Sequence, residues 1–185
     1  MHFKFRGLAV ALMVMSLIMF AKTAQAADDY EQYDMLDDAG VYALVQDVDH
    51  HFSEAKDDFE NHKYKAAAND IRNSTIFLKL AASRGIGNEK KAVQDSVGDL
   101  MKLADKVENG TVKSRKTLDD AFAHAQLALA MNSWIKASEA WNKKDYEAVD
   151  RALEASRKHL KHAKKWAGHN KKKQANKKRK SDQSQ

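Results

Sequence analysis

The chain has 185 residues and a formal net charge of +6, with 43% hydrophobic and 31% charged residues, no proline and no cysteine. The lack of cysteine excludes disulfide bonds and lipid attachment to a cysteine, so the fold must be stabilised by packing. The lack of proline, with only seven glycines, favours long helices and argues against strands.

The first 26 residues have the pattern of a secretory signal peptide. Lys4 and Arg6 form a basic start, residues 8–20 form an apolar run, and Ala24-Gln25-Ala26 supplies small residues for cleavage after Ala26. The apolar run is shorter than the roughly 20 residues that span a bilayer, which disfavours the alternative of an uncleaved anchor. Cleavage would leave 185 − 26 = 159 residues, the size of one domain, in the periplasm or outside the cell.

An internal repeat with a spacing of 82 residues sets the predicted fold. Leu36-Asp37-Asp38-Ala39 aligns with Leu118-Asp119-Asp120-Ala121. The same shift pairs large aromatic residues, Phe52 with Trp134 and Phe59 with Trp141. We therefore infer two copies of one unit, spanning about 35–82 and 117–164.

Each unit is predicted to form two helices joined by a polar turn, in which Asn61 or Asp145 can cap the return helix. Gly85 and Gly168 lie where the return helices are expected to end. Apolar positions of the first helix recur at spacings of four and three, which places them on one buried face. These positions are Val41, Val45, Val48, Phe52, Ala55 and Phe59 in the first unit, and Ala123, Leu127, Ala130, Trp134, Ala137 and Trp141 in the second.

A further helix, from about 88 to 108, connects the units, with Asn88 as its cap and Gly110 as its stop. The predicted fold is all-α: a duplicated long helical hairpin forming a four-helix bundle with an extra crossover helix, within residues 27–169. The first helix of each hairpin would have about 25 residues and a length of roughly 38 Å. A tandem array of helical repeats is the alternative, although two units are few for a solenoid.

Two groups of histidines are candidate metal ligands. His50 and Glu54 are one helical turn apart, as are Asp47 and His51, and imidazole and carboxylate groups bind zinc and copper. On the last helix, His159 and His162 share one face. Copper, zinc or nickel would suit such sites, with copper or zinc as the expected cofactor, and solvated or salt-bridged surface histidines are the alternative explanation. The candidate ligands are His50, His51, Glu54, His159 and His162.

The catalytic patterns that we searched for are missing from the sequence. A di-iron centre in a helical bundle needs Glu-x-x-His on two helices, and the chain has none. There is no Cys-x-x-Cys-His for haem, and the serines lack a Gly-x-Ser-x-Gly context. We therefore expect a protein that is not an enzyme.

Residues 170–185 form a basic tail with seven positive charges, one negative charge and Ala175 as its only apolar residue. Such a segment cannot bury an apolar face, so we predict that it is disordered or a frayed helical extension. After cleavage the chain would carry +3 and its tail +6, leaving a mildly acidic body at −3. The cations of the tail are Lys171, Lys172, Lys173, Lys177, Lys178, Arg179 and Lys180.

A cationic tail of this kind binds polyanions without sequence specificity. In the envelope these would be lipopolysaccharide, anionic lipid or acidic polymers, rather than a specific nucleic acid. A tail that only improves solubility is the alternative.

Two resemblances follow from the second unit. The stretch from Ala128-Leu129-Ala130-Met131 through Trp141-Asn142-Lys143-Lys144-Asp145-Tyr146-Glu147-Ala148, with the alanine and leucine positions that follow to Ala163, resembles the helical repeats of small exported YfdX-type proteins. Its hairpin rhythm is also similar to that of the histidine-rich small metal-binding periplasmic bundle proteins. The first resemblance implies an all-helical periplasmic protein with a stress-linked role, and the second implies copper binding by surface histidines.

The chain departs from the second pattern, which has histidines in nearly every turn, because it offers only His124, His159 and His162 there. We therefore expect a non-enzymatic envelope binding or accessory protein with a cationic tail for anionic surfaces. A copper- or zinc-binding bundle is the alternative.

Overall fold

The computed structural model describes residues 38–45 and 47–182, and the side chains within 40–45 and 47–168. All of these residues belong to one compact unit, Asp37–Gln185. The predicted signal peptide and its cleavage site lie outside the described residues. Every regular element in the described ranges is an α-helix, which confirms the all-α prediction. None of these helices is both long and apolar enough to cross a membrane.

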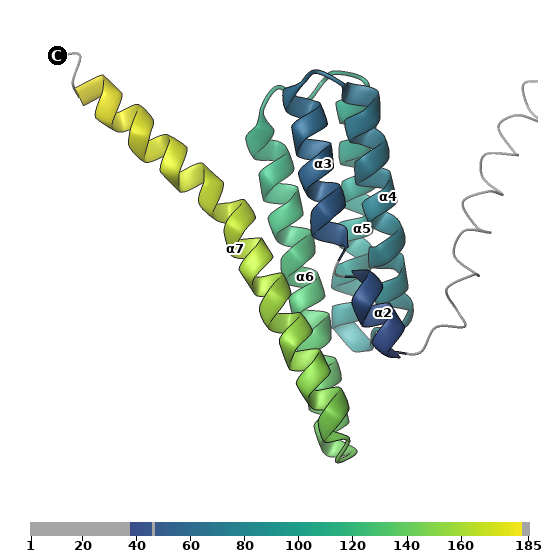
Figure 1. Cartoon of the computed structure of the whole chain (residues 1–185). Helices are drawn as coiled ribbons and strands as arrows, with labels where there is room; N and C mark the ends of the chain where they lie inside the picture. The colour runs from purple at the N-terminus through teal and green to yellow at the C-terminus, as the bar shows by residue number, and fades with distance from the viewer. Residues whose placement is uncertain (1–37, 46, 183–185) are drawn as a thin grey trace, which may run out of the picture. The chain divides into compact units, whose positions relative to one another are not determined.

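The helices follow one another through short connections (Figure 1). They are α2 (Asp38–Val45), α3 (Val48–Glu60), α4 (Tyr64–Ser83), α5 (Gly87–Glu108), α6 (Arg115–Asn142) and α7 (Tyr146–Asp182).

Consecutive helices pack against each other along the chain, from α3 on α4 to α6 on α7, and α3 also contacts α6. The connecting helix α5 packs on both α4 and α6, so it is a full member of the bundle. The expected arrangement, with four helices from the two hairpins and this helix crossing over them, is not confirmed. A connection of only three residues, 84–86, makes α5 the antiparallel neighbour of α4.

The first helix of the first unit is shorter than expected, because it is divided into α2 and α3. At the division the backbone amide of Asp47 donates to the carbonyl of Leu44, three residues back, at 2.9 Å. This bond closes a tighter turn than the α-helical bond to the residue four positions back. The prediction of one helix of about 25 residues is therefore wrong for this unit. In the second unit it is correct, since α6 has 28 residues.

The two hairpin turns are copies of each other, as the repeat predicts. His62 and Lys144, which are 82 residues apart, both have φ of +61°. The amide of His62 donates to the carbonyl of Phe59, and the amide of Lys144 donates to that of Trp141. The aromatic residues that flank each turn also pair alike, Phe59 with Tyr64 and Trp141 with Tyr146, each at 5.7 Å between ring centroids.

The buried faces of the two hairpins differ, and here the prediction from the repeat is wrong for the large side chains of α6, although Ala130 and Ala137 are buried as predicted. Phe52 is fully buried, stacked on Phe122 at 4.2 Å between ring centroids and against the edge of Trp166. Its repeat equivalent, Trp134, is 59% exposed, and Trp141 is 62% exposed. The α6 helix is rotated so that Leu118, Phe122, Ala125 and Leu129 form its core face instead.

The repeat equivalents of the covering residues explain this asymmetry. Phe122 corresponds to Gly40 and Trp166 corresponds to Arg84. Neither Gly40 nor Arg84 supplies an aromatic side chain, so the first unit cannot cover Trp134 in the way the second unit covers Phe52. The second hairpin therefore covers the aromatic residue Phe52 of the first, but the first hairpin does not cover the equivalent Trp134 of the second.

The last helix continues through Gly168, where we expected it to stop, and ends at Asp182. Residues 170–182 are therefore helical, which corrects the expectation of a disordered tail and agrees with the alternative of a helical extension. Lysine, alanine, glutamine and arginine are good helix formers, and no proline interrupts them. The α7 helix has 37 residues and its antiparallel partner α6 has 28, so the end of α7 extends past the start of α6 (Figure 1).

The predicted helix ends are correct in part. Asp145 caps α7 by accepting from the amide of Ala148, and Gly110 follows α5 with φ of +64°. Asn61 and Asn88 do not act as N-caps. Asn61 ends α3, where its side chain donates to the carbonyl of Asp57, and the residue before α5 is Ile86, without a side-chain cap. Gly85 lies in a close contact, because a Cβ there would lie 2.6 Å from Asn132 Oδ1 and would displace that side chain.

Candidate functional site

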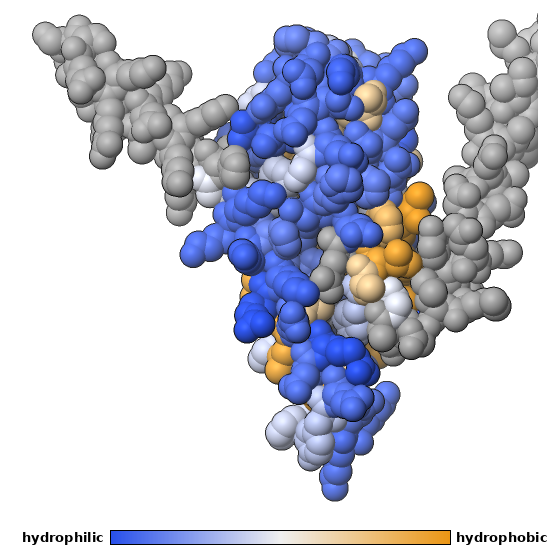
Figure 2. Space-filling view, viewed as in Figure 1, coloured by the Kyte–Doolittle hydropathy of each residue, from blue (hydrophilic) through white to orange (hydrophobic). Residues whose placement is uncertain are grey.

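The surface of the α6–α7 hairpin is the main site of exposed hydrophobic residues. Nine large hydrophobic side chains are exposed in the part of the chain that the structure describes, and seven of them lie on α6 and α7. We call these seven the apolar face. The side of the molecule shown in Figure 2 is mostly hydrophilic, so exposed apolar groups are the exception. The apolar face consists of Leu127, Met131, Trp134, Trp141, Tyr146, Leu153 and Leu160.

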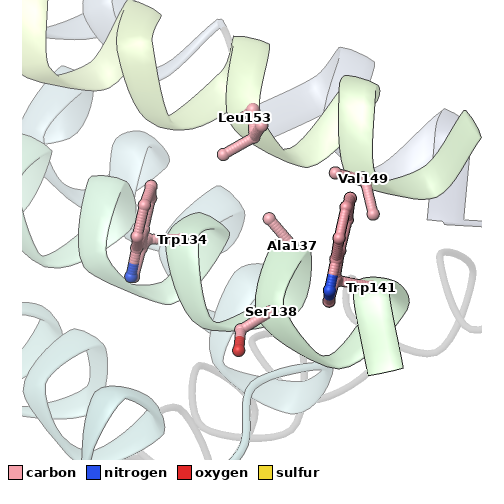
Figure 3. Close-up of a pocket in the computed structure, with 6 residues that line it drawn as sticks. All are labelled: Trp134, Ala137, Ser138, Trp141, Val149 and Leu153. Atoms are coloured by element: carbon pink, nitrogen blue, oxygen red, sulfur yellow. The ribbon is translucent and has the colours of Figure 1, made fainter. Parts of the chain in front are cut away.

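Two open grooves lie along the apolar face. The first has a volume of about 210 Å³, and in it Trp134 and Trp141 of α6 stand on either side of Ala137 and face Leu153 and Val149 of α7 (Figure 3). The second, of about 190 Å³, continues from Trp134 to Leu160. The repeat equivalents of Leu153 and Leu160 are Ile71 and Leu78, and both are fully buried in the first hairpin. The apolar face is thus a core-like surface without a cover in the described residues.

Positive charge is concentrated in the same hairpin. Residues 115–185 contain 18 basic and 8 acidic residues, a formal charge of +10, whereas residues 38–114 contain 11 basic and 13 acidic residues, a formal charge of −2. The positive charge is therefore not confined to the predicted cationic tail but begins within the α6–α7 hairpin. Residues 115–168 alone carry +4, and Lys143 and Lys144 lie exposed between Trp141 and Tyr146 at the turn. The seven predicted polyanion-binding residues, 171–180, lie on α7 outside the ranges of described side chains.

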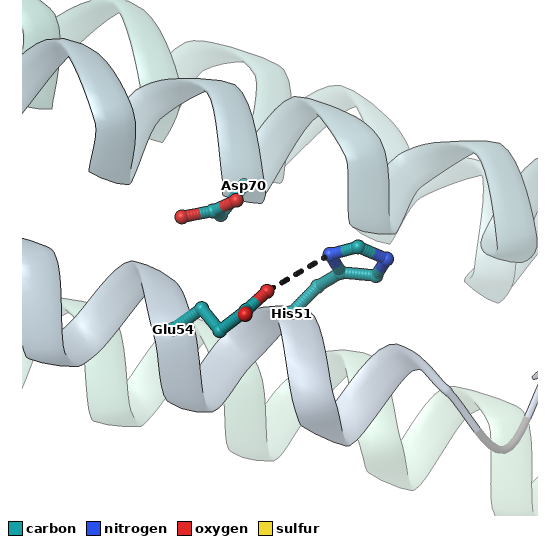
Figure 4. Close-up of side chains that lie close together, drawn as sticks. All are labelled: His51, Glu54 and Asp70. Atoms are coloured by element: carbon teal, nitrogen blue, oxygen red, sulfur yellow. Dashed lines mark ion pairs between the residues drawn. The ribbon is translucent and has the colours of Figure 1, made fainter.

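Two of the predicted metal ligands, His51 and Glu54, lie together on α3 and meet Asp70 of α4 (Figure 4). One ligand atom from each of the three residues lies within 4.8 Å of the others. His51 Nδ1 is 3.7 Å from Glu54 Oε2, and its ring stacks on Phe77 of α4 at 5.4 Å between centroids. The sequence analysis missed Asp70, because nothing in the sequence places it opposite His51.

The cluster on α3 and α4 has several carboxylates close together. Burial, followed by repulsion from Glu54 and Asp58, raises the pKa of Asp70 above its ordinary value. The exposed His50 forms an ion pair with Glu54, with 3.3 Å between Nε2 and Oε1. His50 therefore lies beside the cluster but not among the three atoms that converge.

The remaining two predicted ligands, His159 and His162, do not form an exposed metal site. His159 is only 3% exposed, and its Nδ1 lies 2.7 Å from Gln126 Oε1 in the contact between α6 and α7. Burial, and then the neighbouring His162, lower the pKa of His159 to about 4. His159 is thus a neutral core histidine, and the prediction of a surface site on α7 is wrong for it. Its hydrogen-bond partner lies 33 residues away and could not be inferred from helical spacing.

His162 instead belongs to a group centred on Asp49 of α3. The Asp49 carboxylate accepts from Trp166 Nε1 at 2.7 Å and from Lys165 Nζ at 3.0 Å. His162 Nδ1 lies 2.9 Å from Asp49 Oδ2, outside hydrogen-bond geometry. The Lys165 ammonium and the Trp166 indole N–H thus both contact the Asp49 carboxylate, and the group joins α3 to α7.

The fold and these surfaces define a class of protein: a helical bundle with an apolar, cationic hairpin on one part and a histidine–carboxylate cluster on another. Comparisons with protein-family models, curated proteins and solved structures find no match for the chain. The function must therefore be argued from the residues themselves.

Proposed function

We propose that the chain is a non-enzymatic binding protein of the bacterial envelope, which attaches to anionic lipid surfaces through the α6–α7 hairpin. The observation that carries the proposal is the coincidence of the apolar face and the positive charge on one hairpin. Export to the envelope and the stress-linked role implied by the resemblance to YfdX-type proteins remain predictions.

The aromatic residues of the apolar face suit the interface between water and lipid. Tryptophan and tyrosine are enriched at that interface, because a large apolar ring can enter the acyl boundary while the polar group stays near the headgroups. Trp134 and Trp141 each have more than half of their surface exposed, and Tyr146 is 58% exposed. Moving such a side chain out of water contributes about 1–2 kcal/mol.

The charges favour an anionic surface over a neutral one. Each basic residue held near an anionic bilayer contributes about 1 kcal/mol, within a screening distance of about 10 Å. Lys164 follows Leu160 by four residues and so lies on the same side of α7, next to the apolar face. Lys171 and Lys178 follow Lys164 in the sequence at seven-residue spacings.

Flotation of the purified chain with lipid vesicles tests the proposal. We expect binding to vesicles containing phosphatidylglycerol, and at least tenfold weaker binding to pure phosphatidylcholine vesicles or in 1 M salt. The double variant Trp134→Ala, Trp141→Ala should bind the anionic vesicles at least tenfold more weakly, because it removes about 2–4 kcal/mol of apolar contact. Met101→Ala, which truncates an exposed apolar residue on α5, is the matched control and should bind like the wild type.

Three results would contradict the proposal. The first is equal binding to neutral and anionic vesicles. The second is binding to soluble polyphosphate but not to vesicles, which would assign the cations to an acidic polymer. The third is a dimer in sedimentation equilibrium that the double variant abolishes, in a chain that does not bind vesicles, which would assign the apolar face to a second copy.

A further inference from the structure

We propose that His51, Glu54 and Asp70 form a binding site for one divalent transition-metal cation, with Zn²⁺ as the best-fitting ion. This site lies on α3 and α4 and is independent of the lipid-binding proposal. It uses two of the predicted ligands and adds Asp70, which converts two neighbours on one helix into a cluster held by two helices.

The spacing of the three side chains is close to that of a metal site. Zinc bonds to nitrogen and carboxylate oxygen are about 2.0–2.2 Å long, so tetrahedral ligand atoms lie roughly 3.3–3.6 Å apart. The three ligand atoms here already lie within 4.8 Å of one another without an ion. The Glu54 side chain is 47% exposed, so a change of rotamer that replaces its contact with His50 could bring its carboxylate closer to the other two ligands.

His51 is held more firmly than Glu54. The His51 ring stacks on Phe77, and its side chain is 22% exposed. Its Nδ1 atom is buried and has no hydrogen-bond partner among the described residues, although a buried ring nitrogen normally has one. A metal ion in the cluster would take the lone pair of that nitrogen.

The charges near Asp70 call for a cation. Glu54 and Asp58 both repel the Asp70 carboxylate, and within the described residues no lysine or arginine forms an ion pair with it. Lys63 compensates Asp58 at 3.3 Å, whereas among the described residues the partners of Glu54 are the two histidines His50 and His51. A divalent ion would replace this repulsion with attraction.

The ligand types select the class of metal. One imidazole and two carboxylates suit a cation of borderline hardness such as Zn²⁺, whereas Ca²⁺ and Mg²⁺ prefer all-oxygen sites with six or more ligands. Three protein ligands leave one tetrahedral position for water. Cu²⁺ would compete for the same atoms, because divalent copper generally exceeds zinc in affinity, but it prefers a tetragonal arrangement of ligands to the tetrahedral one that suits Zn²⁺.

Isothermal titration calorimetry of the untagged chain with ZnCl₂ tests the site. We expect one ion per chain with a dissociation constant in the micromolar range, and no saturable heat with CaCl₂. Asp70→Asn keeps the shape of the side chain but removes its charge and should weaken zinc binding at least tenfold. A circular dichroism spectrum will show that this variant keeps the helical content of the wild type.

Asp58→Asn is the matched control, because it removes one negative charge from the same neighbourhood without removing a ligand. Its zinc affinity should stay within about threefold of the wild type, since Asp58 lies outside the coordination sphere and its charge is already paired with Lys63. Equal weakening by Asp58→Asn and Asp70→Asn would show diffuse attraction and overturn the proposal. The proposal would also fail if wild-type chain gave no heat, or if the heat were lost in the double variant His159→Ala, His162→Ala and kept in Asp70→Asn.

Discussion

At the scale of single residues, the surroundings of each histidine decide its role. His51 and His159 both lie on amphipathic helices, and their sequence patterns predict the same role for both. In the structure His159 satisfies Nδ1 with Gln126, whereas Nδ1 of His51 is buried without a hydrogen-bond partner in the described residues. The difference comes from partners on other helices, which helical spacing within one element cannot specify.

The burial of His159 makes the stability of the bundle depend on pH. The folded state lowers its pKa from 6.5 to about 4, mainly through burial, with His162 and Lys158 adding repulsion and Asp49 opposing them. Between these two values the unfolded chain binds the proton more strongly, so the free energy of unfolding falls as the pH decreases from about 6.5 to 4. Each pH unit costs up to about 1.4 kcal/mol, or about 2 kcal/mol between pH 7 and pH 5.

We expect this loss to be absent from His159→Gln, which keeps a hydrogen-bonding group near Gln126 but cannot be protonated. Urea unfolding at pH 7 and pH 5 measures it, and the wild type should lose about 2 kcal/mol more than the variant over this interval. A parallel decrease for both proteins would show that His159 is not the titrating group.

At the scale of helices, the sequence predicted the turns of the hairpins better than their buried faces. The 82-residue repeat relates the turn at 61–63 to the turn at 143–145, and the structure gives both the same hydrogen bonds and the same positive φ. Turns are local, so identical spacing yields identical geometry. Which face of α6 is buried depends instead on Phe122 and Trp166, whose equivalents in the first unit, Gly40 and Arg84, cannot return the contact.

The candidate metal site also shows that local features could be predicted from the sequence, whereas contacts between helices could not. His51 and Glu54 could be paired from the sequence because they lie one turn apart on α3. Asp70 and the exposed apolar face required the packing of different helices, so they became visible only in the structure.

The hairpin turns themselves offer a test of backbone strain. Lys144 has φ of +61°, a conformation that costs a residue with a Cβ about 1–2 kcal/mol, and its side chain is exposed. Lys144→Gly should therefore raise the free energy of unfolding by about 0.5–1 kcal/mol, after the greater flexibility of glycine in the unfolded chain is subtracted. Urea unfolding measures the change.

Lys143, the residue before Lys144, is the matched control. Its φ is −83°, a conformation that is not strained for a residue with a Cβ, so glycine there relieves no strain. Lys143→Gly should lower the free energy of unfolding by about 0.5–1 kcal/mol. Variants that change stability in the same direction would refute the assignment of strain to Lys144.

At the scale of the whole molecule, charge and apolar surface divide the chain into two functional parts. Residues 38–114 carry −2 and contain the histidine–carboxylate cluster, and residues 115–185 carry +10 and contain the apolar face. A cation would be drawn to the first part and an anionic surface to the second. The two proposals therefore predict effects that separate cleanly, since a change in one part leaves the charge of the other unaltered.

Deletion of residues 170–185 tests this division. It removes six units of net positive charge, so binding to phosphatidylglycerol vesicles at low salt should weaken at least tenfold and lose part of its dependence on salt. The apolar face remains, so the weaker binding that is left should still shift tryptophan emission to shorter wavelength as Trp134 and Trp141 enter the interface. Zinc affinity should not change, because the deleted residues lie outside the cluster on α3 and α4. Unchanged retention on the anionic vesicles would remove the tail from the binding surface and leave the described part of the hairpin to carry the attachment.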